Sequence, residues 1–398
     1  MASREGLLGG ARVERIGRER ITTRGLADAA PIKHLDPVLV LTAFALTAIG
    51  ALMIYSASFA SLRDAGLSQT SLVVRQVTFA VAGLVTMILF AAVPYRRLRP
   101  WAPLVYIVSL FLLLAVLTPL GSRSLGAQRW INIGFFQMQP SELAKLSVIV
   151  ALAAVLSAGK GEARVRHVVR CGLLVAPLAV LIYSQPDLGT LLVLLAVTLA
   201  MLLVSGLRLR LLLVLLVLGA VGFYGLLHLG LLKEYQVKRL TAFLDPTTDP
   251  ARTGYNLNQA KIAIGSGGMH GKGLFSGTQT NLDFVPEQHT DFIFTVIGEE
   301  FGFIGGIIVI GLFAIFLWRG TRIAMMSNTL FGSLLAAGIV GMVAFQAFVN
   351  IGMTIGVSPI TGIPLPFVSY GGSSLVTTYA ATGVLLNIHM RRVAKDRW

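Results

Sequence analysis

The stretch PVLVLTAFALTAIGALMIYSASFA, residues 37–60, decides the fold class of this chain. It carries no charge and matches the roughly 17 to 25 apolar residues that cross a bilayer in one helix. Inside a membrane every backbone polar group must be satisfied within the protein, and an α-helix satisfies them within one segment. We therefore expect a membrane-spanning helix that begins near residue 37.

The rest of the chain has the same character. Hydrophobic residues make up 55% of the 398 residues, charged residues only 13%, and the mean hydropathy is +0.77. Soluble domains carry about 25% charged residues, so this composition excludes a soluble protein. Similar apolar runs begin near residues 72, 101, 141, 167, 189, 211, 293, 329 and 373. The sequence predicts an all-α integral membrane protein with about ten transmembrane helices, nine or eleven being the alternatives.

The basic residues indicate how the helices cross the membrane. Segments rich in Arg and Lys fall on one side when ten spans are counted: 94–100, 159–167, 206–210, 317–322 and 389–398. Short cytoplasmic loops are enriched in Lys and Arg, so this side is predicted to be cytoplasmic, together with both chain ends. The net charge of +15 is then a topology signal that implies no nucleic-acid partner, although it can also draw the N-terminal tail toward anionic lipid.

The chain divides into three regions on this basis. Residues 1–36 form a basic cytoplasmic tail without helical apolar periodicity, which predicts flexibility. Residues 37–391 form the polytopic membrane domain, and residues 392–398 form a cytoplasmic C-terminal tail. Within the membrane domain, residues 231–292 make a long extracytoplasmic loop between the seventh and eighth helices, too long for a passive connection.

Other polar stretches are predicted on the same outer side as this loop. They are 121–145, 184–190 and 356–374. The Gly and Pro residues of TGIPLPFVSYGG, residues 361–372, interrupt a helix at membrane depth, which is tolerated only where the backbone is buried or lines a cavity. We therefore expect these segments to converge around a cavity.

Several charged residues have both a structural and a functional interpretation. Glu142 and Lys145 stand three apart on one helix face, where the pair can neutralise itself within the membrane. The guanidinium group of Arg129 is always charged and its paired N–H donors suit a phosphate, whereas its neighbour Trp130 can serve as an interfacial anchor. Asp187, in the stretch SQPDLGT, is a candidate helix N-cap.

The glycine-rich stretch GSGGMHGKG, residues 265–273, is similar to a phosphate-binding loop. It departs from the Walker pattern twice, since Ser266 stands at the first glycine position and Gly273 replaces the Ser or Thr after Lys272. The alternative that this stretch forms a turn whose backbone amides and Lys272 bind an anion is left open. The histidines lack metal-ligand spacing such as H-E-x-x-H, which argues against zinc.

Asp291 stands at the lip of an apolar run in VPEQHTDFIFTVIGEE, residues 285–300. As a helix cap, together with Thr290, it would meet the positive end of the helix dipole, which lowers a carboxyl pKa. As a general base it would be partly desolvated, which raises the pKa. The sequence leaves both open, as it does a glycosidase-like carboxylate pair of Asp291 with Glu287.

Taken together, several motifs resemble the SEDS family of bacterial membrane proteins, and most closely its elongation branch. They are, in order, GAQRW…QPSELAK, QPDLGT, GSGGMHGKG…GTQ, PEQHTDFIF…GEE and GIPLPFVSYGGSS. The resemblance covers residues 37–391. It implies a peptidoglycan glycosyltransferase that polymerises lipid II, with release of undecaprenyl diphosphate, at the outer face of the bacterial cytoplasmic membrane.

The resemblance also implies roles for individual residues and for partners. The family's essential acid falls on Asp291, which is the expected general base. The residues expected to bind substrate are Gln128, Arg129, Glu142, Lys145, Asp187, Lys272, Ser369 and Tyr370. A class B penicillin-binding protein, a transpeptidase, is the expected partner, together with other membrane proteins of the elongation complex. A divalent cation, Mg²⁺ or Mn²⁺, is left open, and no other cofactor is expected.

Two other functions fit parts of the pattern. A lipid II flippase would also use broken helices and charges within the membrane. Against it, the polar motifs gather on one predicted face and no internal symmetry is detected. A non-catalytic scaffold for the partner synthase would tolerate isosteric replacement of Asp291 and Arg129.

Overall fold

The structure is a computed structural model of the full chain. It describes residues 34–124, 127–134, 136–159, 165–230, 234–245 and 253–392. The predicted basic tail, except for its last residues, and the end of the chain after residue 392 lie outside these ranges.

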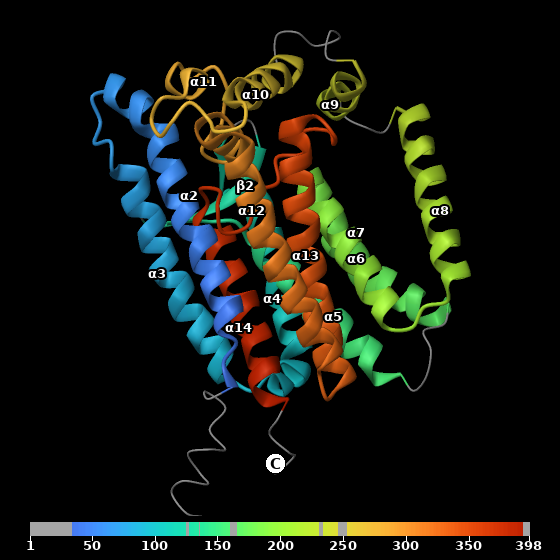
Figure 1. The fold of residues 1–398 in the computed structure, drawn as a ribbon. Helices are drawn as coiled ribbons and strands as arrows, with labels where there is room; N and C mark the ends of the chain where they lie inside the picture. Colours follow the sequence, from blue (N-terminus) through green and yellow to red (C-terminus); the bar gives the residue numbers. More distant parts are fainter. Residues whose placement is uncertain are drawn as a thin grey trace, which may run out of the picture.

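Ten long apolar helices build the body of the molecule (Figure 1). They are α2 (Pro37–Asp64), α3 (Ser71–Ala92), α4 (Leu98–Leu117), α5 (Pro140–Ala158), α6 (Val165–Ser184), α7 (Leu188–Val204), α8 (Leu209–His228), α12 (Ile293–Met325), α13 (Leu330–Ile355) and α14 (Gly372–Arg391). Each begins within three residues of a predicted span. Seven are long and apolar enough to cross a membrane, if the short 3-10 turn η2 (Tyr95–Arg97) is counted with α4. Helices α7 and α8 have shorter apolar stretches, and α14 is more polar.

Local sequence signals explain where these helices start and stop. Asp36 caps α2, accepting hydrogen bonds from the backbone amides of Val38 and Leu39, and Pro37 supplies a preset φ at the first helical position. Asp36 also pairs with Arg319 of α12. Helix α13 ends at Gly356, whose φ of +80° a residue with a side chain adopts only at a cost.

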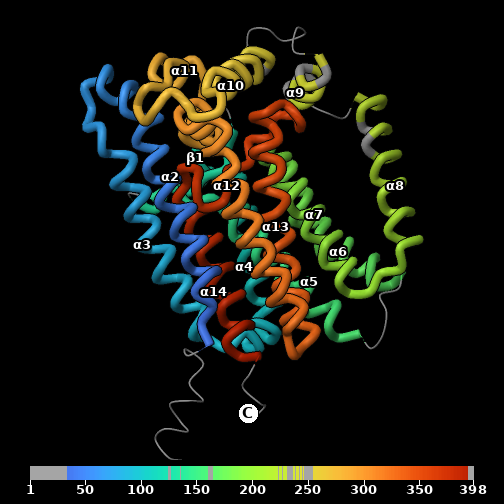
Figure 2. Tube along the Cα trace, viewed as in Figure 1, coloured from blue at the N-terminus to red at the C-terminus, as the bar shows by residue number. Residues whose placement is uncertain are grey.

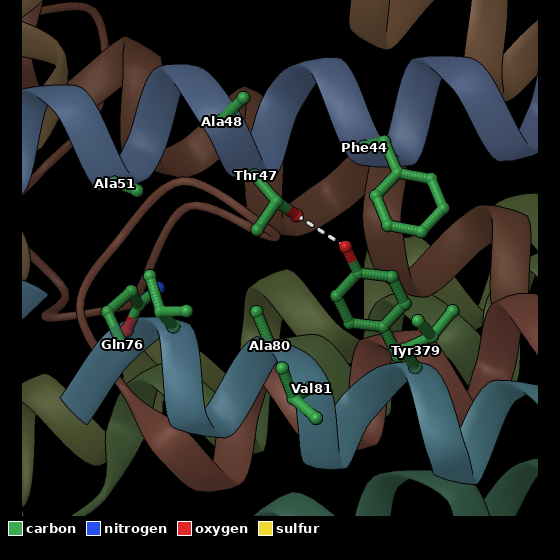
Figure 3. Close-up of a pocket in the computed structure, with 10 residues that line it drawn as sticks. Phe44, Thr47, Ala48, Ala51, Gln76, Ala80, Val81 and Tyr379 are labelled. Carbon is green, nitrogen blue, oxygen red and sulfur yellow. Dashed lines mark hydrogen bonds between the residues drawn. The ribbon is translucent and has the colours of Figure 1, made fainter. Parts of the chain in front are cut away.

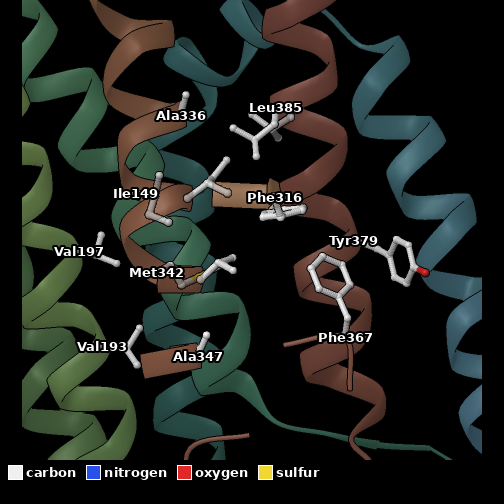
Figure 4. Packing of buried hydrophobic residues seen from close by; sticks show 14 of the residues in the cluster. Ile149, Val193, Val197, Phe316, Ala336, Met342, Ala347, Phe367, Tyr379 and Leu385 are labelled. Carbon is white, nitrogen blue, oxygen red and sulfur yellow. The ribbon is translucent and has the colours of Figure 1, made fainter. Parts of the chain in front are cut away.

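The centre of the bundle is formed by α5, α13 and α14, the helices with the largest share of buried residues. Figure 4 shows how side chains from neighbouring helices fill this centre, with Ile149 of α5 and Met342 of α13 between Val197 of α7 and Phe316 of α12. The rings of Phe367 and Tyr379 pack edge to face at the α14 side. Two of these enclosed helices carry polar groups described below: α5 carries the Glu142–Lys145 pair, and α13 carries the amide of Asn350.

A three-stranded antiparallel sheet lies between α4 and α5 in the chain, a feature that the all-helical prediction missed. Its strands are β1 (Gly121–Ser124), β2 (Ala127–Ile133) and β3 (Phe136–Met138), in the order β1-β2-β3. Ile131 of β2 pairs with Gly121 on one side and Met138 on the other. The predicted helical membrane fold is otherwise confirmed.

The long segment between α8 and α12 is folded rather than an open loop. It contains α9 (Glu234–Leu244), α10 (Thr253–Gly267) and α11 (Thr278–Asn281). These helices cover one end of the bundle, opposite the end where α2 begins and α14 finishes (Figures 1 and 2). The predicted convergence of polar segments on one face is therefore met for this segment and for the adjoining sheet.

Helix α12 is broken at Gly302, which has φ +64° and ψ −157°. The carbonyls of Glu299 and Glu300 at the break accept hydrogen bonds from the amides of Lys272 and Gly273. The amides of residues 303 and 304 donate to the carbonyls of residues 268 and 269. The glycine-rich stretch thus completes the backbone of a broken membrane helix. The amides of Lys272 and Gly273 are used in these hydrogen bonds, so they are not offered to an anion.

Close packing explains the glycines of this stretch. A Cβ on Gly271 would lie 2.1 Å from the carbonyl oxygen of Glu300, and a Cβ on Gly267 would lie 2.0 Å from that of Gly298. Gly271 also has φ +81°. Only a residue without a side chain fits here.

We predict that Gly271→Ala lowers the free energy of unfolding by at least about 1 to 3 kcal/mol, because it strains the backbone and displaces Glu300. Gly265→Ala is the matched control: it lies in α10 with open space around its Cβ, so it is expected to stabilise by up to about 1 kcal/mol. Thermal unfolding of the purified variants in detergent checks this. Equal melting temperatures would contradict the packing argument.

Candidate active site

Asp291 lies in a turn that ends where α12 begins. The N-cap of α12 is Phe292, and no side chain caps this helix. Thr290 instead donates its hydroxyl to the backbone carbonyl and the carboxylate of Glu287, both at 3.1 Å. The interpretation of Thr290 and Asp291 as a helix cap is therefore wrong, and the Asp291 carboxylate is directed elsewhere.

The segment before α14 holds the backbone on which Asp291 stands. The amide of Tyr370 donates to the carbonyl of His289 at 2.9 Å, and the hydroxyl of Ser369 donates to the carbonyl of Thr290 at 2.5 Å. The rings of His289 and Tyr370 lie 5.7 Å apart. Burial lowers the pKa of His289, which favours its neutral form. Both residues of this segment predicted to bind substrate thus lie next to Asp291 in the fold.

Asn350 of α13 extends this support to Asp291 itself. Its side-chain amide donates to the carbonyl of Asp291 at 2.9 Å and to the carbonyl of Ile363 at 2.7 Å. Asn350 is fully buried. Sequence analysis missed it, although a polar amide inside an apolar helix is a recognisable signal.

Charged groups on both sides set the acidity of Asp291. The net effect of its surroundings raises the pKa of Asp291 to about 6; burial is the largest cause, and the charge of Glu287 acts in the same direction. Arg239 and Arg129 lower the pKa, and Asp187 raises it by a smaller amount. Desolvation therefore outweighs the two arginines, so the carboxylate is a stronger base than an exposed aspartate and is still ionised at neutral pH.

Arg239 of α9 is a second residue that sequence analysis missed. A Cβ built on Gly362 would lie 3.2 Å from Oδ2 of Asp291 and 4.0 Å from Nη1 of Arg239, so both side chains reach the same glycine. Gly362 has φ +71° and leaves room for them. Helix α9 thus brings a cation to the acid from a distant part of the chain.

Arg129 and Asp187 meet at the start of α7. Arg129 of β2 donates to the carbonyls of Gln185, at 3.0 Å, and Pro186. Asp187 caps α7 by accepting from the amide of Thr190 at 3.1 Å, which confirms its predicted structural role. Its other oxygen accepts from the hydroxyl of Thr190 and from the side chains of Gln139 and Ser141.

Gln128, beside Arg129 in β2, has a different position. Its side-chain amide donates to the carbonyls of Thr118 and Gly121, at 2.8 and 3.1 Å. These contacts fasten the sheet to the end of α4. The structure gives Gln128 a role in holding the strand that carries Arg129.

The two lysines predicted to bind substrate are both held in ion pairs. Lys145 pairs with Glu142 at 2.8 Å, and both side chains are buried in α5, so the predicted pair is confirmed. Lys272 pairs with Glu299 at 2.8 Å. Glu299 also accepts hydrogen bonds from Thr278, Gln279 and Thr280. Lys272 therefore connects the segment between α8 and α12 to helix α12.

A membrane-facing groove ends at the segment that supports Asp291. It has a volume of about 230 Å³, lies between α2 and α3, and is floored by Tyr379, whose hydroxyl is 2.9 Å from that of Thr47 (Figure 3). At one end, buried Gln76 donates to the carbonyl of Ser369 at 3.3 Å and accepts from the amide of Gly371 at 3.5 Å. The groove is otherwise almost entirely apolar.

Within the described ranges, no three His, Cys, Asp or Glu side chains gather in a way that could hold a metal ion. The site as built offers a desolvated carboxylate, two guanidinium groups and an adjoining apolar groove. Such a set can take a proton from a hydroxyl and stabilise an anionic leaving group.

Comparisons with known proteins identify the family of this chain. Residues 37–394 match the family model described as FtsW/RodA/SpoVE cell cycle protein. The chain is 40% identical over 359 residues to the peptidoglycan glycosyltransferase MrdB of Escherichia coli, with 90% of this chain and 94% of that protein covered.

Solved structures give the same result. A chain of a peptidoglycan synthase complex that coordinates polymerization and crosslinking matches with a TM-score of 0.76 and 34% identity, over 91% of this chain and 99% of that chain. The rod shape determining protein RodA of Thermus thermophilus matches with a TM-score of 0.67 and 34% identity, over 91% and 98%.

Proposed function

Because this chain belongs to the FtsW/RodA/SpoVE family of cell cycle proteins, we propose a mechanism for it in which Asp291 is the general base. The chain is a peptidoglycan glycosyltransferase, an integral membrane enzyme. The observation that carries the proposal is the half-buried Asp291 carboxylate, whose pKa desolvation raises and on which the charges of Arg129 and Arg239 act.

The reaction joins two lipid-linked disaccharides, the substrate being lipid II. Asp291 takes the proton of the acceptor sugar hydroxyl while that oxygen bonds to the anomeric carbon of the donor chain. The bond from this carbon to the diphosphate breaks, and undecaprenyl diphosphate leaves. A base whose pKa is close to the working pH suits this step.

The departing diphosphate needs positive charge. We assign this role to Arg129 and Arg239, because both act on Asp291 electrostatically and guanidinium groups bind phosphate oxygens in pairs. Lys145 and Lys272 are already neutralised by carboxylates, so they support the site from within the fold. A Mg²⁺ or Mn²⁺ ion, if one takes part, would be held by Asp291 and mainly by the diphosphate itself.

The apolar groove between α2 and α3 suits an isoprenoid chain that enters from the bilayer, since its inner end adjoins the segment at Ser369. Its occupant would place a diphosphate toward the end of the bundle covered by α9 to α11. The basic segments lie at the other end, which supports an extracytoplasmic site and cytoplasmic chain ends. We infer a class B penicillin-binding transpeptidase as partner, with other elongation proteins.

Asp291→Asn is predicted to reduce polymerisation of labelled lipid II by about 10² to 10⁴-fold, because the amide cannot accept the proton. The control is Asp64→Asn, an exposed acid at the end of α2 on the same side, which is expected to keep full activity. The assay uses the purified complex with the transpeptidase of the partner blocked. Full activity of Asp291→Asn in a folded protein would refute the base assignment.

The pH dependence follows from the pKa of about 6 for Asp291. Activity is expected to rise as the pH increases through about 6 and the base loses its proton. Glu287→Gln removes a charge that raises this pKa, so its midpoint should move to lower pH. Arg239→Gln removes a charge that lowers it, so the midpoint of its residual activity should move to higher pH. Midpoints that stay fixed in both variants would contradict the electrostatic account.

Asn350 is predicted to position Asp291. Loss of its two hydrogen bonds, at about 1 kcal/mol each, should lower kcat roughly 30-fold in Asn350→Ala with little change in KM. The kcat of Asn350→Asp should fall by as much, and the midpoint of its pH–activity profile should also move to higher pH, because the substitution adds a negative charge. Thr354→Val, one turn along α13, is the matched control. A fall in melting temperature with unchanged kcat would indicate a purely structural role.

A further inference from the structure

A second membrane-facing groove lies on another side of the bundle, where α4 and α6 flank α5. It has a volume of about 280 Å³. Its walls are apolar, and small side chains create the hollow: Ala102 of α4 with Ala151 and Ala154 of α5. The hydroxyl of Tyr106 donates to the carbonyl of Leu174 at 2.7 Å across α4 and α6, which satisfies the polar groups at the groove's inner end.

Arginines stand at the mouth of this groove. Arg99, in the first turn of α4, is one of the residues that line it. Arg170 of α6 is exposed and lies four residues before Leu174, hence on the same face of its helix and one turn nearer the basic end of the bundle. Because α4 and α6 run in the same direction (Figure 1), Arg170 lies on the same side of the Tyr106–Leu174 contact as Arg99, toward the basic end of the bundle.

The position of the groove indicates what fills it. Side chains beside it, such as Leu104 and Leu173, are more than half exposed on the apolar surface, so lipid and not water surrounds the opening. The groove runs from Arg99 to Ile107, about 12 Å at 1.5 Å per residue, away from the basic end. An acyl chain fits the walls, and a phosphate fits the guanidinium groups at the mouth.

The same geometry separates this groove from the active site. Arg99 begins α4 at the end of the bundle where the basic segments lie, whereas Asp291 lies at the end that α9 to α11 cover. A lipid whose headgroup sits at Arg99 therefore has its headgroup in the opposite leaflet from Asp291.

We propose that the groove between α4, α5 and α6 binds one anionic phospholipid of the leaflet at the basic end of the bundle. One acyl chain occupies the hollow beside Ala151 and Ala154, and the phosphate lies between Arg99 and Arg170. This site is independent of the glycosyltransferase mechanism.

Native mass spectrometry of the delipidated full chain, titrated with phosphatidylglycerol or phosphatidylcholine of equal chain length, tests the proposal. Wild type should bind phosphatidylglycerol more tightly. Each arginine is expected to contribute about fivefold to the affinity for phosphatidylglycerol. The double variant Arg99→Gln, Arg170→Gln should therefore bind phosphatidylglycerol roughly 25-fold more weakly, with little change in its affinity for phosphatidylcholine. Ala154→Leu fills the hollow and should weaken binding of both lipids.

Arg322→Gln is the matched control, because this exposed arginine ends α12 at the same end of the bundle, away from α4 and α6. It should leave phosphatidylglycerol binding unchanged. Equal loss in Arg322→Gln would show diffuse charge attraction, and unchanged binding in Ala154→Leu would show that no chain enters the groove. A polyprenyl phosphate that displaces phosphatidylglycerol at a much lower concentration would assign the groove to another lipid. Each of these three results overturns the proposal, and melting curves with polymerisation activity confirm that the variants are folded.

Discussion

The requirement that backbone polar groups be satisfied away from water governs this structure. Helix α12 breaks at Gly302, and the freed carbonyls and amides are paired by the glycine-rich stretch before residue 274. Three successive carbonyls, from residue 289 to residue 291, are likewise paired by Tyr370, Ser369 and Asn350. Irregular backbone exists at these depths only because other segments complete it. The site acid therefore stands on a main chain that is held by two other segments, the one before α14 and helix α13.

The same environment sorts the charged side chains into two groups. Buried ions are costly unless they are paired, and Glu142 with Lys145 and Glu299 with Lys272 are paired. The first pair lies within α5 and the second joins the glycine-rich stretch to α12, and both leave little charge for a ligand. Asp291, by contrast, has acids and arginines around it whose effects on its pKa oppose one another. Opposing charges thus act on Asp291 together, which suits a group that exchanges a proton.

Sequence patterns predicted the helices well and the site only in part. Apolar runs predict where helices start because a membrane span must be built of apolar residues. The cap at Asp187 was predictable because an Asp just before a helix is a local signal. The cap at Asp291 was wrong because the Thr290 hydroxyl bonds to Glu287 instead, and because Asn350, from a distant part of the chain, holds the carbonyl of Asp291. Arg239 and Asn350 were missed because their partners lie far away in the sequence; a polar amide in an apolar helix marks Asn350 as unusual but does not identify Asp291 as its partner. The role of Lys272 changed for the same reason, since Glu299 reaches it only after the chain folds back.

The electrostatic balance at Asp291 also bears on when the base becomes strong. In the free enzyme the two arginines lower its pKa, while burial and Glu287 raise it. A bound diphosphate on Arg129 and Arg239 would offset their charge and bring its own negative charge near the carboxylate. Both changes raise the pKa of Asp291 further, so the carboxylate becomes more basic when the donor is in place and the acceptor hydroxyl is beside it. An acid exposed to water would not gain in this way, because the solvent would screen the diphosphate. In the proposed mechanism, burial of Asp291 would therefore do more than raise its resting pKa: it would couple the strength of the base to occupancy of the donor site.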